Sequence, residues 1–191
     1  MVKIDSVEPL NDAQFIKPIR INYTQNNIKK TWEAVVSHDS VAILLYHTQK
    51  KAFVLVKQLR VTVLNSNKKQ GDTYELCAGI IDKDIPDIQI AKEEILEECG
   101  YNIALDSIKK ITSYYTSVGI SGARQTFYFA KCDESMKVNN GGGLEDEDIE
   151  VVYLPLDQAK EFIFDENFQK TPGLIMAFYW FFDNTELIQT L

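Results

Sequence analysis

The sequence predicts an α+β fold in which a mixed sheet packs between helices. Apolar runs of strand length outnumber the helical patterns, and the two are interleaved without a regular strand–helix–strand repeat. The chain has 191 residues and is 45% hydrophobic, which is enough for one domain with a substantial core. We divide it into an N-terminal strand region, residues 1–38, and a main domain, residues 39–191.

The N-terminal region predicts a β-hairpin. Its strands are expected at residues 15–23 and 30–36, on either side of the turn signal Gln25-Asn26-Asn27. The hairpin has little apolar content of its own, and isolated two-stranded hairpins are only marginally stable in water. It must therefore pack on another surface, either that of the main domain or that of a partner subunit.

The main domain begins with two apolar runs, residues 41–46 and 52–56, that predict central strands buried on both faces. The segment from 133 to 147, with its three consecutive glycines, predicts a mobile loop without packed elements. The other predicted elements are a polar loop at 65–72, strands at 73–78, 108–116, 125–132 and 149–154, a short helix at 156–164 and an aromatic helix at 172–182 whose aromatic stripe belongs to the core.

One further helix is predicted from Asp87, a suitable N-cap, to Gly100, a suitable stop. At 100° per residue, Glu94, Glu97 and Glu98 fall within about 100° of one another. They lie beside an apolar stripe of Ile88, Ala91, Ile95 and Cys99. Carboxylates crowded in this way repel one another unless a cation lies between them, and Mg²⁺ prefers such oxygen ligands. The alternative is a solvated acidic helix face.

Composition excludes several classes of function. A net charge of −8 argues against general nucleic-acid binding, which relies on basic surface. The three cysteines form no paired motif and indicate a reducing compartment, so we expect a cytoplasmic protein. A basic-then-apolar leader and a membrane-spanning apolar run are both absent from the sequence, so we expect no membrane partner.

The helix and the loop before it resemble the signature of the Nudix hydrolases, G-x5-E-x7-R-E-U-x-E-E-x-G-U. The residues that stand at its spacings are Gly79, Glu94, Ile95, Glu97, Glu98, Gly100 and Tyr101. Other segments are similar to the members that cleave nucleoside diphosphate sugars, above all the animal UDP-sugar pyrophosphatases. These segments are Lys57-Gln58-Leu59-Arg60, Glu75-Leu-Cys-Ala-Gly79, the Ser-x-Gly segment ending in Arg124, and Val-Tyr-Leu-Pro-Leu at 152–156. The resemblance implies a Nudix fold.

Two positions depart from the signature. Ile85 stands where the family has its first glutamate, and Glu93 stands where it has an arginine that orients a catalytic glutamate. Glu93 adds a negative charge beside Glu94 and Glu97, and Lys92 points about 100° away from position 93. The expected consequence is a less ordered metal site or a lower rate.

The resemblance implies roles for individual residues. Glu94 and Glu98 would be the principal ligands of Mg²⁺, or of Mn²⁺, together with the backbone carbonyl of Ala78. Glu97 would bind a further metal ion or orient water. In the acidic loop Glu147 would be the general base or last metal ligand, with Glu145 second; the alternative is a solvated acidic loop.

The resemblance also places substrate contacts. Arg60 and Arg124 would bind phosphate or sugar, the alternative for each being a surface role. Gly119 would line the substrate site, and Trp32 is a candidate to stack on a base, unless it is a packed aromatic. The ADP-ribose branch has Ser-Pro-Gly followed by a glutamate, whereas this chain has Ser117-Val118-Gly119 and Ala123. That difference disfavours ADP-ribose as the substrate.

The expected function is hydrolysis of a UDP-sugar, UDP-glucose in the first place, to UMP and a sugar 1-phosphate by a homodimer that exchanges its N-terminal strands. One alternative is an ADP-ribose or ADP-sugar pyrophosphatase. The other, motivated by Ile85 and Glu93, is a nucleotide-sugar-binding protein with weak catalysis.

Overall fold

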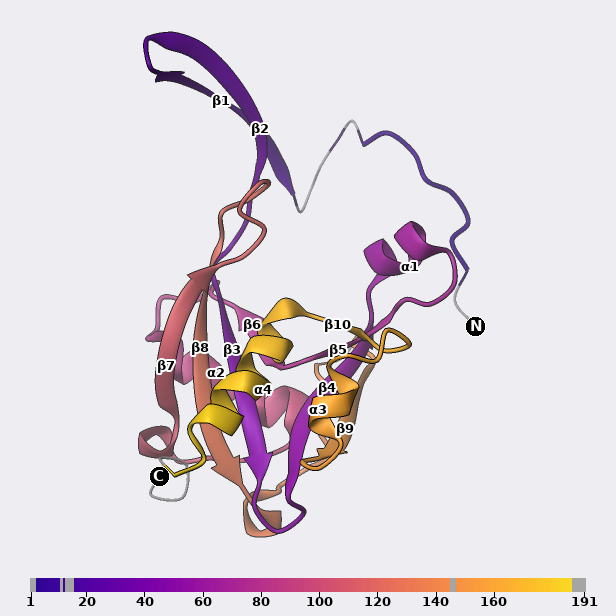
Figure 1. The fold of residues 1–191 in the computed structure, drawn as a ribbon, viewed down its shortest axis with the longest axis vertical. Coiled ribbons are helices and arrows are strands. Elements are labelled where there is room, and N and C mark those ends of the chain that lie inside the picture. The colour runs from indigo at the N-terminus through magenta and orange to yellow at the C-terminus, as the bar shows by residue number, and fades with distance from the viewer. Residues whose placement is uncertain (1–2, 11, 13–15, 145–146, 187–191) are drawn as a thin grey trace.

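The computed structural model describes residues 3–10, 12, 16–144 and 147–186. An eight-stranded mixed sheet forms the body of the molecule (Figure 1). Helix α2 (Asp87–Cys99) packs on one face of the sheet, and helices α3 (Ala159–Phe162) and α4 (Pro172–Asp183) pack on the other. This is the predicted α+β architecture, and it fits the Nudix fold.

The sheet is organised around β3, whose residues Val41 to Leu45 are almost completely buried. Its main path runs β10-β5-β4-β3-β8-β7, with β6 also paired to β3 and β9 also paired to β4. The β3–β8 and β5–β10 pairs are parallel, and the other pairs are antiparallel. The strands are β3 (Ser40–His47), β4 (Ala52–Leu59), β5 (Asp72–Glu75), β6 (Cys77–Ile80), β7 (Lys109–Tyr115), β8 (Arg124–Cys132), β9 (Ile149–Pro155) and β10 (Gln169–Lys170).

The two faces of the sheet have different cores. The face under α2 is mainly aliphatic, with Ile90, Ala91, Ile95 and Cys99 of the helix buried against β3 and β4. The face under α4 is aromatic: the rings of Phe53 and Phe178 stack with their centroids 4.3 Å apart. Of the stripe predicted to be core, Phe178 and Phe181 are buried, whereas Tyr179 is 48% exposed, because it lies on the outer side of α4.

The N-terminal hairpin forms a separate two-stranded sheet that projects from the body (Figure 1). Its strands are β1 (Lys17–Gln25) and β2 (Ile28–Val36), joined by Asn26 and Asn27, both with positive φ. The predicted hairpin is confirmed, although its strands extend further toward the turn. It contacts the β7–β8 connection through a hydrogen bond from the Val35 N–H to the Ile120 carbonyl, 2.9 Å.

Alternation along the paired strands gives the hairpin one apolar face. The apolar residues on this face are Ile19, Ile21, Tyr23, Ile28, Trp32, Ala34 and Val36, and Lys17, Gln25 and Lys30 lie on the same face. Six of the apolar residues expose between 37% and 60% of their surface, Ala34 being the exception. Most of the small apolar content of the hairpin is therefore gathered on one side, where it remains open to contact; Pro18 and Val35 lie on the other side.

Two predicted elements differ in the structure. A short helix, α1 (Val61–Asn67), was not predicted and takes up the first residues, 65–67, of the expected polar loop at 65–72. It has no buried residue and so leaves no apolar periodicity in the sequence. The strand predicted at 73–78 is split at Leu76: β5 pairs with β4, and β6 pairs with β3. The split occurs because β3 and β4 pair only from Leu45 to His47 and then diverge.

None of the helices in the described part of the chain is long and apolar enough to cross a membrane. The three cysteines, Cys77, Cys99 and Cys132, are buried and unbridged.

Candidate active site

Helix α2 begins after Pro86 and ends at Gly100. Its N-cap is Pro86, so the prediction of Asp87 as N-cap is wrong; Asp87 is the first helical residue, and its carboxylate accepts a hydrogen bond from the Thr126 hydroxyl, 3.2 Å. At the other end Gly100 adopts a left-handed conformation, φ 80°, and stops the helix as predicted.

Helix α2 presents two of its glutamates to a cavity of about 390 Å³ at the end of β6, which we call the carboxylate cavity. Its lining includes Arg60, Glu75, Glu94, Glu98, Gln125 and Glu147. Glu98 is only 4% exposed, and its Oε2 accepts a hydrogen bond from the Ala78 backbone N–H, 2.9 Å. Glu94 packs directly on Gly79, where a Cβ atom would overlap its carboxylate. Glycine is therefore required at position 79 for this close approach.

The two glutamates carry strongly perturbed carboxyl groups. Burial, followed by repulsion from Glu97 and Glu147, raises the pKa of Glu94 to about 7. Burial raises the pKa of Glu98 to about 8, although the hydrogen bond from Ala78 opposes the shift. Carboxylates that are costly to ionise in a cleft identify a candidate functional site, because a bound cation would remove that cost.

The glycine-rich loop is packed against the end of α2. The Gly142 N–H donates to the Glu98 carbonyl, 3.0 Å, and the Gly143 N–H donates to the Glu97 carbonyl, 3.1 Å. These bonds satisfy carbonyl groups that the last turn of a helix leaves open. The expectation of an unpacked loop is therefore wrong for this part, because its glycines, all with positive φ, allow the backbone to come close.

This packing brings the acidic segment to the site. Glu147 lies at the exposed rim of the carboxylate cavity, together with Glu94 and Glu98. Its carboxylate accepts a hydrogen bond from the Leu144 N–H, 2.9 Å, and its own N–H donates to the Leu144 carbonyl, 2.7 Å. Glu145, the second candidate for general base, lies outside the described residues.

Arg60 lines the same cavity and forms a two-point ion pair with Glu75. Its Nε and Nη2 groups lie 2.7 Å from the two carboxylate oxygens, and Glu75 is also hydrogen-bonded by the Thr73 hydroxyl, 2.5 Å. A guanidinium has five N–H donors, so the two bonds to Glu75 fix its plane and leave donors for a phosphate.

Sequence reasoning did not assign Glu75 and Gln125 to the site. In the sequence, Glu75 stands only as part of the segment before Gly79, and Gln125 only as the first residue of the strand expected at 125–132. Both line the carboxylate cavity. Their signal in the sequence is weak, because each becomes a site residue only through the pairing of its strand.

Other predicted residues lie elsewhere in this chain. Glu97 is half-buried next to Glu94 and does not line the cavity, and the side chain of Arg124 is exposed at the start of β8. Trp32, on the apolar face of the hairpin, donates a hydrogen bond from Nε1 to the Gly119 carbonyl, 2.9 Å. Trp32 and Gly119 thus contact each other, away from the carboxylate cavity.

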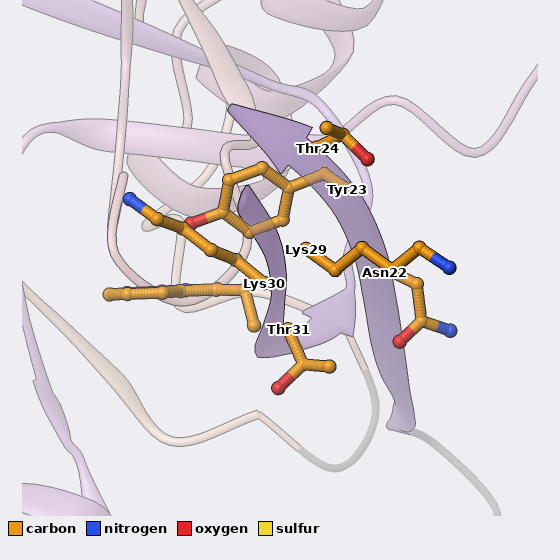
Figure 2. A pocket seen from close by; sticks show the side chains of 7 residues that line it. Asn22, Tyr23, Thr24, Lys29, Lys30 and Thr31 are labelled. Atoms are coloured by element: carbon orange, nitrogen blue, oxygen red, sulfur yellow. The ribbon is translucent and has the colours of Figure 1, made fainter. Parts of the chain in front are cut away.

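A shallow groove on the hairpin includes Trp32 in its lining. Figure 2 shows Tyr23 and Lys30 side by side on one side of the ribbon, with Asn22 and Lys29 pointing to the other side. This arrangement follows from the register, since Tyr23 pairs with Lys30 and neighbouring residues alternate between the faces.

At the two positions that depart from the Nudix signature, 85 and 93, the structure shows what each side chain contacts. Ile85 is partly buried against the aliphatic core under α2. Glu93 forms an ion pair with Lys83, with Oε2 2.6 Å from Nζ, on the solvent side of the helix. Its charge is therefore balanced locally.

The donor set suits a hard divalent cation, because the cavity gathers carboxylate oxygens and burial makes Glu94 and Glu98 costly to ionise without one. Within the described residues, no three Asp, Glu, His or Cys side chains converge closely enough to hold a metal ion as they stand. The carboxylates share a cavity, but they would have to move together to coordinate one ion.

No protein-family model matches the chain, but several curated proteins are similar to most of it. The uridine diphosphate glucose pyrophosphatase NUDT14 of Bos taurus is 35% identical over 198 aligned positions, which cover 89% of each chain. The protein of the same name from Mus musculus is 32% identical over 200 positions, again 89% of each chain. The GDP-mannose pyrophosphatase of Enterobacter sp. (strain 638) is 34% identical over 174 positions, 89% of this chain and 90% of the relative.

These similarities extend far beyond the segment from Gly79 to Tyr101, and the structure places the glutamates of that segment, Glu94 and Glu98, in one cavity. The chain belongs to the Nudix family of hydrolases and, within it, to the group of the nucleotide-sugar pyrophosphatases.

Proposed function

We propose that this protein hydrolyses the pyrophosphate bond of a UDP-sugar, UDP-glucose in the first place, to UMP and a sugar 1-phosphate. The observation that carries the proposal is the convergence of Glu94, Glu98 and Glu147 with Arg60 around one cavity. Acidic groups for a cation and an arginine for phosphate are the pair that pyrophosphate cleavage requires. The named activity of the Bos taurus and Mus musculus relatives supports uridine and glucose.

Membership of the Nudix family implies a divalent metal ion, and we propose Mg²⁺, with Mn²⁺ as a substitute. Glu94 and Glu98 would hold it, with the Ala78 carbonyl, and Glu97 would hold a further ion or orient water. When bound, the ion neutralises charge on the phosphates and lowers the pKa of water.

Two further roles, accepting a proton from water and binding a phosphate, fall to other residues of the chain. Glu147 accepts the proton of the attacking water, a role supported by its place at the rim of the cavity facing Glu94 and Glu98. Glu145 remains the second candidate for this role. Arg60, oriented by Glu75, contacts a phosphate oxygen and keeps the diphosphate in place.

Arg124, Trp32 and Gly119 lie outside the carboxylate cavity of their own chain, so their proposed substrate contacts call for a second subunit. We infer a homodimer in which residues 1–38 are the dimerisation region and residues 39–191 the catalytic domain. The exposed apolar face of the hairpin supports this division, since apolar surface gathered in one place usually marks an interaction site.

Three free thiols are consistent with a cytoplasmic protein.

The test is turnover of UDP-glucose by the purified full-length chain in excess Mg²⁺, with UMP and glucose 1-phosphate identified by chromatography and phosphorus NMR. Reaction in ¹⁸O-labelled water shows which phosphorus is attacked. Glu98→Gln is the matched inactive variant. Failure to release UMP from any UDP-sugar would reject the proposal.

A second substrate, GDP-mannose, is favoured by one specific observation. The Enterobacter sp. relative, a GDP-mannose pyrophosphatase, matches 89% of this chain, a share equal to that matched by the Bos taurus uridine diphosphate glucose pyrophosphatase. A kcat/KM for GDP-mannose above that for UDP-glucose would transfer the proposal to GDP-mannose.

A further inference from the structure

A second cavity of about 390 Å³ adjoins the carboxylate cavity and shares Glu75, Ala78 and Gln125 with it. We call it the tyrosine cavity. Tyr114 and Tyr115 at the end of β7 form one side, and Thr171 and Gly173 at the start of α4 form another. Its volume falls in the range of about 300–1,000 Å³ that is usual for small-molecule pockets. A molecule whose middle lies among the carboxylates therefore has the tyrosine cavity directly beside it.

The charges in the two cavities are different. Among the described residues that line the tyrosine cavity, none is Lys, Arg or His, and Glu75 is its one carboxylate. That carboxylate is already neutralised by the two-point ion pair with Arg60. A phosphate would find no cation here, so the part of the substrate that enters must be uncharged.

The polar groups of the tyrosine cavity are fixed by a chain of hydrogen bonds. The Tyr114 hydroxyl donates to Oε1 of Gln125, 2.6 Å, and Nε2 of Gln125 donates to the Ser40 hydroxyl, 3.0 Å. Burial raises the pKa of Tyr114, which keeps its hydroxyl protonated as a donor. These bonds use one of the two lone pairs of Oε1 and one of the two hydrogens of Nε2, so they fix the plane of the Gln125 amide and leave one acceptor site and one donor for a ligand.

The rest of the lining suits a sugar. The hydroxyls of Ser117 and Thr171 can donate to a hexose. The Thr116 hydroxyl, whose hydrogen is donated to the Ala123 carbonyl, can still accept. The tyrosine rings add flat apolar surface of the kind on which the C–H face of a sugar ring packs.

Gly173, at the start of helix α4, packs closely against the Tyr114 hydroxyl. A Cβ atom at position 173 would lie 2.6 Å from the Tyr114 hydroxyl and 3.5 Å from Oε1 of Gln125. Gly173 is the second residue of α4 and has no left-handed φ, so its backbone does not require glycine. Glycine weakens a helix relative to alanine; the reason for it here is the space that the Tyr114 hydroxyl occupies.

We propose that the tyrosine cavity binds the hexose of the nucleotide sugar and that Tyr114, Gln125 and Gly173 determine which hexose is accepted. This inference rests on the function proposed above and adds the place and the means of sugar selection. The diphosphate lies in the carboxylate cavity, the hexose passes Glu75 and Gln125 into the tyrosine cavity, and the nucleoside points the other way.

The experiment compares the wild-type protein with Gly173→Ala. Because the added methyl group displaces the Tyr114 hydroxyl, we expect the ratio of kcat/KM for UDP-glucose to that for UDP-galactose to change by about tenfold. The ratio for UDP-glucose and GDP-glucose, which differ only in the base, should stay within about twofold. Calorimetry should show weaker binding of glucose 1-phosphate and unchanged binding of UMP.

A second variant covers the case in which Gly173→Ala does not fold. Tyr114→Phe keeps the ring but frees Oε1 of Gln125, and it should shift the same sugar ratio and leave the base ratio alone. Tyr179→Phe, on the exposed side of α4, is the matched control and should change neither.

The outcomes are separable. If the wild type cleaves UDP-glucose but a folded Gly173→Ala or Tyr114→Phe variant changes neither ratio, the cavity does not select the sugar and the inference is wrong. If the base ratio and UMP binding change instead, the nucleoside occupies the tyrosine cavity, which also overturns it. A wild type that cleaves no nucleotide sugar overturns the proposed function, and the inference with it.

Discussion

The carboxylate cavity and the N-terminal hairpin are built in opposite ways. The cavity is assembled from β5, β6, α2 and the glycine-rich loop of one chain, and its glutamates are held in place by core packing and backbone hydrogen bonds. The hairpin forms its own small sheet, with its apolar face exposed. The difference shows that a core can force like charges together, whereas a two-stranded sheet leaves its apolar face for a partner.

The largest effect is expected from Glu98→Gln, which tests whether the packed carboxylate is catalytic. The amide oxygen of the new glutamine can still accept the hydrogen bond from the Ala78 N–H. The substitution removes the negative charge that would hold a cation. We expect kcat to fall by about a hundredfold or more, with an unchanged or higher melting temperature because a costly buried carboxylate is removed. Wild-type turnover by this variant would contradict a role for Glu98 in metal binding.

Gly79→Ala tests the close packing that positions Glu94. The new Cβ atom would overlap the Glu94 carboxylate, which can swing away at the end of its flexible side chain. The protein should therefore fold, while kcat/KM falls by about tenfold because a displaced ligand is poorly positioned. Activity assays and circular dichroism together check this; a folded variant with full activity would show that Glu94 need not sit against Gly79.

Ile21→Lys tests whether the apolar face of the N-terminal hairpin is a subunit interface. It places a charge in the apolar face of the hairpin, next to its cross-strand partner Trp32. If that face is a subunit interface, the variant should be monomeric in light scattering and several-fold less active. Asn22→Lys, one residue along and on the opposite face, is the control and should remain dimeric. A wild-type monomer would remove the basis for the dimer.

The raised pKa values of Glu94 and Glu98, about 7 and about 8, predict a pH-dependent effect of the metal. In the unfolded chain both groups titrate near their ordinary value, so between that value and about 8 the folded protein holds more protons. The stability of the metal-free protein therefore falls as pH rises through this window. Mg²⁺ needs the ionised groups, so it should raise the melting temperature more at about pH 8.5 than at about pH 6. Equal shifts would contradict the assignment.

The smallest effect is expected from Glu93→Ala. The sequence suggests that this glutamate burdens the site with an extra charge, but the structure pairs it with Lys83 in a solvent-exposed position. Exposed ion pairs contribute about 0–1 kcal/mol to stability. Activity should accordingly stay within about twofold of wild type. A large increase in activity on Glu93→Ala would restore the view that Glu93 hinders catalysis.

Elements with strong local signals were predictable from the sequence. The buried runs of β3 and β4, the turn at Asn26-Asn27 and the Gly100 stop of α2 each depend on neighbouring residues alone. Helix α1 was missed because a short exposed helix has no apolar stripe to reveal it. The N-cap of α2 was misplaced because the Asp87 carboxylate bonds a distant strand instead of its own helix.

The sequence by itself determined the acidic face of α2, the spacing of Glu94, Glu97 and Glu98, and the glycines at 79 and 100, because these follow from the 3.6-residue period and from backbone sterics. Only the tertiary structure decided which acids share a cavity. The divergence of β3 and β4 splits the strand at Leu76 and brings Glu75 into the site. The parallel pairing of β8 with β3 brings Gln125 there, and contacts far apart in the chain bring Glu147 to the rim. Long-range pairing of this kind leaves no periodic trace in the sequence, because it depends on how distant strands and loops meet.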